Sequence, residues 1–405
     1  MNQSDAVSII AIASTGLSER IYEEMPENKC PTNEKGPKMS ILAIAALSLQ
    51  ASSAPEVTIS DFVGEITLEQ GPQLSVQVER QAGNEAVDVA EAANTITIDG
   101  GQSTRRWGCY GRSSDQRVGP NRSSAKAFDD YPRLVITSPE PVNLKIERSI
   151  VEAVTMDLSE LNLGARACGR FVAGDIAGDT DIGLGGSMIA MIGNIGGDAS
   201  LSLSGSGSIE AGTIEGGLEG SISGSGDLSA GRIGGDVSFG GSGSGQADFG
   251  DVGGTMSVRL SGSGDVTAGD VRPLTVSTSG SADVEVGDVS GPIAFRATGS
   301  GDLSAQNFSG LTMSTSGSSA FSGGTLEGPF DASLSGSGRV SIEAGRAEPF
   351  TFGSSGSGSA NFGGTAVNAD IRLSGSGGAR VGLVEGAQSV RSSGSGRFRV
   401  TGNSN

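Results

Sequence analysis

The sequence predicts an all-β solenoid in which rungs of about nineteen residues stack in parallel, and three observations lead to this class. A Ser-Gly-Ser-Gly unit recurs eleven times, with small variations, between residues 204 and 396. Gly makes up 67 of the 405 residues and aromatic residues only 4%, which leaves too little bulk for a deep globular core. Apolar residues nevertheless recur at fixed places in every unit. A solenoid reconciles these facts because each turn buries only a thin interior against its neighbours.

The repeat has a nearly constant length. Position s denotes the first residue of each unit, and successive units lie 18 to 20 residues apart. A period held over eleven copies is the signature of a repeat architecture. The units begin at Ser204, Ser223, Ser242, Ser261, Ser279, Thr298, Ser316, Ser335, Ser355, Ser374 and Ser393.

Columns of apolar residues predict which side chains face the interior. Position s+5 is apolar in every copy, and positions s−3 and s+10 are apolar in most copies. Strand side chains alternate between faces, so s−3, s+5 and the glycines at s+1 and s+3 point inward, while the serines at s and s+2 point outward. Val266 is therefore expected inside and Thr267 outside. We interpret the inward glycines as a tight bend, or as a waist where opposite walls approach too closely for Cβ atoms. The parity changes between s+7 and s+10, where we expect a turn.

The repeat weakens before Ser204, and the upstream region is less regular. Strand-like alternation is found at 56–60, 64–69, 73–80, 94–99, 133–138 and 142–147, whereas 101–131 is rich in Gly, Ser and Arg and is expected to be a loop. We interpret 55–160 as an irregular N-terminal β cap of the solenoid, which then covers 161–405. A separate small β domain is the alternative.

The N-terminus predicts a leader that is removed on export. The apolar stretch 39–50 is too short to span a bilayer, follows Lys35 and Lys38, and precedes the small residues 51–54. This order is typical of a secretory signal peptide, so 1–54 is excluded from the fold. Translation begins at Met25 or Met39, or the basic segment is unusually long. A buried strand or helix is the alternative. The protein is therefore expected in the periplasm, on the cell surface or secreted.

The cysteine count predicts one disulfide. Cys30 would be lost with the leader, which leaves Cys109 and Cys168. Two cysteines in an exported protein favour a disulfide, although two free thiols are an alternative. Neither cysteine has CxxC spacing, so metal binding by these thiols is not expected.

Charge and composition exclude several functions. The net charge of −19 argues against nucleic acid or an anionic membrane as the partner. The chain has no His, which removes Ser-His-Asp and Cys-His nucleophile arrangements and His-ligated metals. No transmembrane domain is expected in the mature chain, and no cofactor is predicted.

Position s+4 offers the strongest candidates for chemistry. Asp265, Asp283 and Asp302 occupy this position in three successive units, so their carboxylates would lie about 4.8 Å apart. Such a stripe could bind Ca²⁺, which favours several carboxylate oxygens. The same residues could instead be turn-forming, solubilising aspartates, and this interpretation is favoured. The late units become basic, with Arg339, Arg372, Arg380, Arg391, Arg397 and Arg399. This charge gradient could orient the rod on a surface, or it could be a solvated end.

Three segments carry a family resemblance. Glu56-Val-Thr-Ile, Asn94-Thr-Ile-Thr-Ile-Asp and the repeated Ser-Gly-Ser-Gly-Asp at 223–227 and 261–265 resemble the bacterial family of the putative auto-transporter adhesin, head GIN domain. The resemblance covers about residues 56–400. It implies a right-handed parallel β-helix on the cell envelope or in the periplasm. It supplies no catalytic residue.

The function expected from these observations is an exported, non-catalytic module of the cell envelope, used for adhesion or as a structural spacer. Its partner would be an envelope or extracellular ligand such as a glycan or a surface. Two alternatives remain open, a glycan-active β-helix enzyme and a Ca²⁺-binding repeat protein. A surface cleft lined by two or more carboxylates would favour the enzyme, and a smooth rod would favour the binding module.

Overall fold

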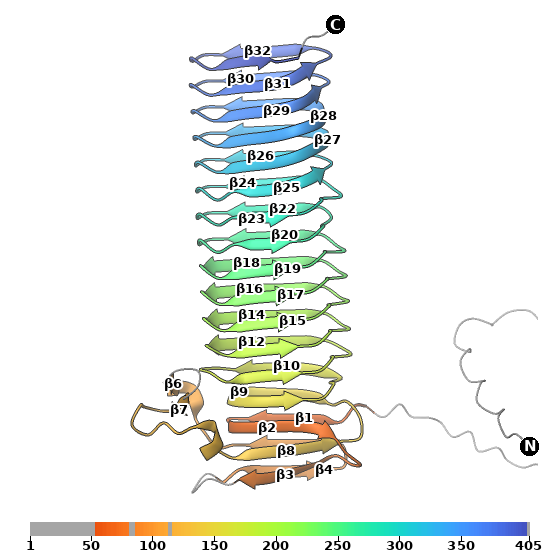
Figure 1. The fold of residues 1–405 in the computed structure, drawn as a ribbon, viewed down its shortest axis with the longest axis vertical. Coiled ribbons are helices and arrows are strands. Elements are labelled where there is room, and N and C mark those ends of the chain that lie inside the picture. The colour runs from red at the N-terminus through yellow and green to blue at the C-terminus, as the bar shows by residue number, and fades with distance from the viewer. Residues whose placement is uncertain (1–52, 81–85, 112–115, 403–405) are drawn as a thin grey trace, which may run out of the picture. The chain divides into compact units, whose positions relative to one another are not determined.

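The computed structural model describes residues 53–80, 86–111 and 116–402. The predicted leader, residues 1–54, therefore lies almost wholly outside the described residues. In the described part, parallel strands stack as a β-solenoid of about 14 turns, with equivalent residues about 19 apart (Figure 1). The prediction of an all-β parallel solenoid is confirmed.

Each rung of the repeat region contributes two short strands, one to each face of the solenoid. On the first face, Leu201 lies in register between Ile182 and Gly220. The strands of this face are β10 (Glu160–Ala165), β12 (Thr180–Gly186), β14 (Ala199–Gly205), β16 (Leu218–Gly224), β18 (Val237–Gly243), β20 (Met256–Leu260), β22 (Leu274–Thr278), β24 (Ile293–Ala297), β26 (Leu311–Thr315), β30 (Ala369–Leu373) and β32 (Gln388–Ser392).

The second face repeats the same register. Three long strands, β9 (Asn143–Thr155), β27 (Ala320–Leu334) and β28 (Arg339–Ser354), contribute to both faces. The other strands of the second face are β11 (Arg170–Ala173), β13 (Ile189–Ile192), β15 (Ser208–Ala211), β17 (Asp227–Ala230), β19 (Gln246–Phe249), β21 (Val266–Ala268), β23 (Val284–Val286), β25 (Leu303–Phe308), β29 (Ser359–Ala366), β31 (Gly378–Val384) and β33 (Arg397–Val400).

The apolar columns form the interior, as the side-chain parity predicts. Val266 at s+5 is 1% exposed, Val276 at s−3 is 0% exposed and Ile233 at s+10 is 0% exposed. Thr267 is half-buried on the outer side, and its hydroxyl contacts the Asp248 carboxylate of the preceding rung. Burying one such aliphatic side chain contributes about 1.5–3 kcal/mol, so a few columns stabilise each rung. The final rung departs from the pattern, since Val390 is 46% exposed.

The repeated glycines are required by the stacking of rungs. A Cβ atom at Gly299, at position s+1, would lie 2.0 Å from the carbonyl oxygen of Gly280 in the preceding rung. That oxygen accepts the N–H of Ser300 at 2.9 Å, so a side chain at s+1 would displace the acceptor of an axial hydrogen bond. At s+3 the opposite wall also contributes, because a Cβ at Gly226 would lie 2.5 Å from Cδ2 of Leu203. The glycines are therefore required by close contact with the preceding rung along the solenoid axis, a reason that was not predicted from the sequence.

The N-terminal rungs stack out of chain order. On the first face, β1 (Glu56–Ser60) lies between β5 (Thr95–Asp99) and the first half of β9. On the second face, β2 (Val63–Gln70) lies between β8 (Arg133–Ser138) and the second half of β9. The first rung of the chain is thus inserted between two later rungs, as Figure 1 shows.

Two antiparallel strands complete this end of the stack. β3 (Ser75–Arg80) pairs with β8, and β4 (Asp88–Ala92) pairs with β5. The alternation in the sequence located β3 but not β4, whose residues are mostly exposed and carry no apolar periodicity. Because β3 and β4 pair antiparallel, the parallel stacking of rungs ends at these two strands.

A side lobe projects from the N-terminal rungs (Figure 1). The sequence predicts a loop at 101–131, and the structure shows short elements within it. They are the 3-10 turns η1 (Thr104–Arg106) and η2 (Phe128–Asp130) and the hairpin of β6 (Gly108–Tyr110) with β7 (Arg117–Gly119). Across the described ranges, no helix is long and apolar enough to cross a membrane.

Candidate functional site

The most regular exposed feature is the bend that carries the Ser-Gly-Ser-Gly units, here called the Ser-Gly edge and comprising positions s to s+3. Ser374 and Ser376 are exposed in one unit, and Ser393 and Ser395 in the next. The N–H of Ser376 donates to the carbonyl of Gly356 at 3.0 Å, so the backbone is engaged axially. The hydroxyls remain at the surface, where Ser395 Oγ lies 3.3 Å from Ser376 Oγ. The edge therefore presents a ladder of hydroxyl groups.

A shallow groove follows the Ser-Gly edge on the side of the first face. It has a volume of about 750 Å³ and extends over six rungs of the C-terminal half. Its walls are the side chains at s−2, s−1 and s, most of which are serine, threonine or leucine. Its charged residues are Arg296, Arg372 and Arg391.

A second groove follows the same edge on the side of the second face. It has a volume of about 490 Å³ and lies in the last rungs. Its walls include Ser359, Asn361 and Ser376, and its charged residues are Arg339, Arg380, Arg397 and Arg399. The Ser-Gly edge of these rungs is thus flanked by arginines on both sides. Sequence analysis found these residues but not their convergence on one edge.

A third groove, of about 990 Å³, lies on the first face of the N-terminal rungs and is acidic. Lys145 is the cation among its lining residues. Its carboxylates belong to Glu56, Glu160, Asp179, Asp181, Asp198, Glu219 and Asp236. A cleft with several carboxylates is the feature that was expected to favour a glycan-active enzyme.

Several carboxylates of this acidic groove are engaged by the backbone of the next rung. Asp179 accepts the N–H of Asp198 at 2.9 Å, and Asp198 accepts the N–H of Gly217 at 2.7 Å. Asp236 accepts the N–H of Thr255 at 2.7 Å and its hydroxyl at 2.9 Å. The backbone hydrogen bond from Thr255, followed by the hydroxyl hydrogen bond, lowers the pKa of Asp236 below its ordinary value. The lowered pKa makes Asp236 an ionised hydrogen-bond acceptor, whereas a general acid needs a raised pKa.

The candidate Ca²⁺ residues make the same kind of contact. Asp265 accepts the N–H of Asp283 at 3.3 Å, and Asp283 accepts the N–H of Asp302 at 2.9 Å. Asp302 in turn accepts the N–H of Ala320 at 2.7 Å. One oxygen of each carboxylate is therefore used for axial hydrogen bonding. Within the described ranges, no group of three or more His, Cys, Asp or Glu side chains is placed to hold a metal ion.

A second ladder of the same type, at s+9, was not predicted from the sequence. Asp251 accepts the N–H of Asp270 at 3.0 Å, Asp270 accepts that of Asp288 at 2.9 Å, and Asp288 accepts that of Asn307 at 3.2 Å. The spacing of these residues by 18 or 19 was visible in the sequence. Side-chain acceptors are needed here because the backbone leaves the regular strand conformation at the turn.

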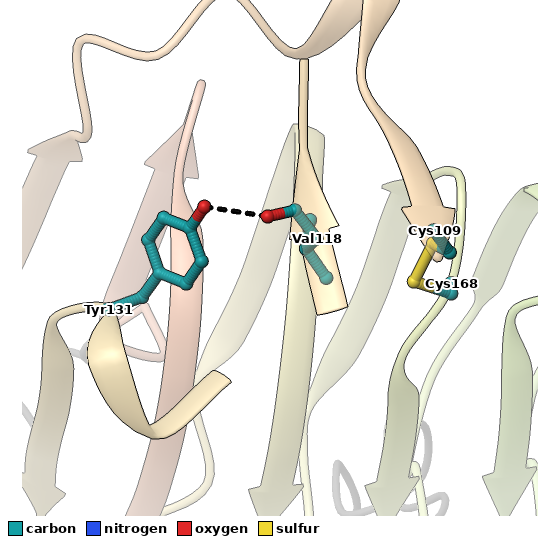
Figure 2. The surroundings of a disulfide bond; sticks show 4 residues. All are labelled: Cys109, Val118, Tyr131 and Cys168. Atoms are coloured by element: carbon teal, nitrogen blue, oxygen red, sulfur yellow. Dashed lines mark hydrogen bonds between the residues drawn. A yellow bond between two sulfur atoms is a disulfide. The ribbon is translucent and has the colours of Figure 1, made fainter. Parts of the chain in front are cut away.

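Cys109 and Cys168 are joined in the structure, as Figure 2 shows, with their Cα atoms 6.1 Å apart. Cys109 lies in the side lobe and Cys168 in the turn between β10 and β11. Cys168 is fully buried in a small apolar cluster with Val118, Phe128 and Tyr131. The Tyr131 hydroxyl donates to the carbonyl of Val118 at 2.8 Å (Figure 2). The lobe is therefore attached to the solenoid covalently and by a core of its own.

Comparison with known proteins relates the C-terminal part of the chain to a described family. Residues 290–404 match the family model described as putative auto-transporter adhesin, head GIN domain. The match confirms the resemblance for this segment, which holds the last six Ser-Gly units and both basic grooves. No curated protein matches the chain, and no solved structure matches it.

Proposed function

We propose that the protein is an exported, non-catalytic binding module of the cell envelope that contacts its ligand with the Ser-Gly edge. The observation that carries the proposal is the ladder of exposed hydroxyls with a long shallow groove on either side. It lies within the segment that matches the adhesin-like family. A regular array of polar groups in successive rungs suits a long or repetitive ligand better than a small molecule.

The lengths of the rungs support a binding rather than a catalytic role. From Ser204 to Ser393 the rungs have 18 to 20 residues, so no long loop rises beside the Ser-Gly edge. Enzymes on repetitive scaffolds place their catalytic groups on loops that enclose the substrate. An open edge allows a polymer or a surface to lie along several rungs at once.

The experiment that tests this function is a glycan array probed with the full chain. Selective binding to extended glycans supports a binding module. Substitution of exposed serines by bulky residues along the edge, for example Ser376→Trp with Ser395→Trp, is expected to weaken that binding. The matched control places the same pair of substitutions at Ser257 and Ser238, outside the edge on the first face. Equal loss of binding in both variants would place the contact elsewhere.

A glycan-active enzyme is the second candidate, because the acidic groove holds seven carboxylates. Equivalent side chains in adjacent rungs are about 4.8 Å apart, close to the separation used by retaining glycosidases. The test is release of reducing ends from polysaccharides by the full chain and by the Asp181→Asn and Glu219→Gln variants. Depolymerisation that is lost in either variant would replace the binding module with the enzyme.

A Ca²⁺-binding repeat protein is the third candidate and rests on Asp265, Asp283 and Asp302. Excess Ca²⁺ would raise the melting temperature if these residues formed a site, since a ligand that binds the native state stabilises it. We expect no such shift, because each carboxylate already accepts a backbone N–H. A shift that the Asp283→Asn variant abolishes would establish the site.

Export is part of the same proposal and has its own test. Removal of residues 1–54 follows from the basic, apolar and small-residue segments before Pro55. Mass spectrometry of the protein from its producing cell should find a mature N-terminus near Pro55. A peptide from upstream of Met39 in the exported protein would disprove it.

A further inference from the structure

We propose that the ligand of the Ser-Gly edge is an anionic polysaccharide whose carboxylate or sulfate groups bind the arginines of the last rungs. This inference rests on the proposed binding function and specifies the chemical class of the ligand. The residues that carry it are Arg339, Arg380, Arg397 and Arg399 in one groove, with Arg372 and Arg391 in the other.

Arginines of the last two rungs are stacked in register with one another. Arg372 pairs with Arg391 across β30 and β32, and Arg380 pairs with Arg399 across β31 and β33. Rung neighbours are about 4.8 Å apart, and like charges directly opposite each other destabilise a sheet. Two such pairs on adjacent rungs of an acidic protein have no structural benefit. A bound polyanion would offset the repulsion within each pair by forming attractive ion pairs with both arginines.

Acidic side chains that could neutralise these arginines are scarce at this edge. The described residues lining the two basic grooves include seven arginines and no Asp or Glu. Arg372 has one partner, Asp370 at 2.5 Å. The acidic residue in the segment from Arg372 to Arg399, Glu385, pairs instead with Arg346 at 2.9 Å. All six edge arginines are exposed, so their guanidinium groups are accessible to a ligand.

The residues that surround the arginines also indicate the kind of ligand. The grooves are lined by hydroxyls, small residues and leucines, and no aromatic ring lies among their described lining residues. Single-stranded nucleic acids need aromatic platforms on which bases stack. Hydroxyl groups beside guanidinium groups suit a ligand that carries both hydroxyls and anions, as an acidic polysaccharide does. Arg binds carboxylate and sulfate groups through paired N–H donors, which adds geometric selectivity.

The periodicity of the edge matches a linear polymer. The arginines of the second-face groove lie in two columns. Arg380 and Arg399 are direct neighbours in one column. In the other, Ser359 and Gly378 separate Arg339 from Arg397. A chain laid along the solenoid axis would bring neighbouring anionic groups against the adjacent pairs Arg372–Arg391 and Arg380–Arg399. A single small anion would use only one or two of them, so affinity should rise with chain length through multivalency.

The experiment measures binding of the full chain to immobilised polygalacturonate by interferometry. The edge variant combines Arg380→Gln, Arg397→Gln and Arg399→Gln. The control variant combines Arg232→Gln, Arg259→Gln and Arg272→Gln, which removes the same charge from exposed positions of the middle rungs. We expect the edge variant to lose at least tenfold in affinity and to show a weaker dependence on salt. The control should change less than twofold. Circular dichroism melts establish that both variants are folded.

Three further probes distinguish among ligand classes. Neutral dextran should not bind, and single-stranded DNA and anionic lipid vesicles should bind more weakly than polygalacturonate. Equal affinity of the edge and control variants, or preferential binding of DNA or vesicles, would overturn the inference. Binding of neutral array glycans that the edge variant retains would also overturn it while leaving the proposed binding function intact. Depolymerisation of a glycan without stable binding would overturn the proposed function itself.

Discussion

The side-chain parity of the rungs makes a sharp prediction at two neighbouring residues, Val276 and Ser277 in β22. Val276 is 0% exposed and lies between Val258 and Phe295 of the adjacent rungs. Ser277 points outward between Arg259 and Arg296. Substituting Asp at either position adds the same carboxylate to the same strand. Only the direction of the side chain differs.

The cost at Val276 can be worked out from its burial. Loss of the buried valine costs about 1.5–3 kcal/mol. A neutral carboxyl without a hydrogen-bond partner costs roughly another 1–3 kcal/mol. Holding it protonated at neutral pH, from an ordinary pKa of about 3.9, costs about 4 kcal/mol more. The sum is comparable to the whole stability of a typical domain, about 5–15 kcal/mol. The damage should extend to both neighbouring rungs, because repeat stability is a sum of nearest-neighbour terms.

At Ser277 the same substitution should be neutral or mildly stabilising. The new carboxylate would face two arginines, and an exposed cross-strand pair of opposite charge contributes about 0.2–1 kcal/mol. Thr267, the outward neighbour of Val266, is a poorer control. Its hydroxyl contacts the Asp248 carboxylate and its other register partner is Glu285, so an Asp there would meet like charges.

Thermal and urea melts followed by far-ultraviolet circular dichroism measure both variants. Ser277→Asp should melt within a few degrees of the parent. Val276→Asp should lose its cooperative transition or melt far below it. The folded Val276→Asp protein would bind more protons than the unfolded chain, so its stability should fall as pH rises from about 4 to 7. Equal destabilisation by the two substitutions, or a pH-independent loss at Val276, would refute the assigned parity.

Three other predictions concern the disulfide, the glycines and the aspartate ladders. Non-reducing peptide maps of the exported protein should contain the Cys109–Cys168 peptide, and Cys109→Ser should destabilise the protein by about 4 kcal/mol in the chain-entropy model; two free thiols would contradict this. Gly299→Ala should lower the melting temperature, whereas Gly183→Ala should not, because a Cβ at Gly183 would meet nothing within 4 Å. Equal effects of the two substitutions would contradict the steric explanation for the repeated glycines. In an NMR titration the Asp236 pKa should lie below its ordinary value and rise in Thr255→Val. The stability that this carboxylate contributes is present at neutral pH and lost on acidification, and an unchanged pKa in Thr255→Val would show that the hydroxyl contributes nothing.

The repeat region could be predicted from the sequence because its interactions repeat. Ile233 has neighbours equivalent to those of Ile214, which lies one period earlier in the chain. A column of apolar residues in the sequence therefore identifies the interior directly. The N-terminal rungs could not be ordered in this way. Val57 lies between Ile96 and Leu144, and these partners are 39 and 87 residues away with no shared period. Alternation located the strands, but the pairing depends on long-range contacts that a local pattern does not encode.

The candidate site was only partly visible for a related reason. The sequence showed a group of arginines in the last rungs. It did not show on which side of the Ser-Gly edge each arginine lies, because that depends on where the chain bends. Arg391 at s−2 and Arg397 at s+4 fall in different grooves, although six positions separate them in the chain. The aspartate ladder at s+9 was missed because only the aspartates at s+4 were considered as candidate residues. The role of the s+9 aspartates is the hydrogen bond to the next rung.

The net charge of the chain is an incomplete guide to its partners, because part of its acidity has a structural use. Asp175, Asp251 and Asp270 supply acceptors for backbone N–H groups at turns, where no strand partner is available. Each rung of an aspartate ladder needs such a carboxylate, and the ladders lie mainly in rungs that precede the last ones. The net charge of −19 therefore includes carboxylates whose role is to build the turns. The arginines of the last rungs serve no comparable purpose in the fold, and their stacking in register opposes it. Their charge is the part of the total that is free to specify a ligand, and it favours a polyanion that the overall acidity would exclude.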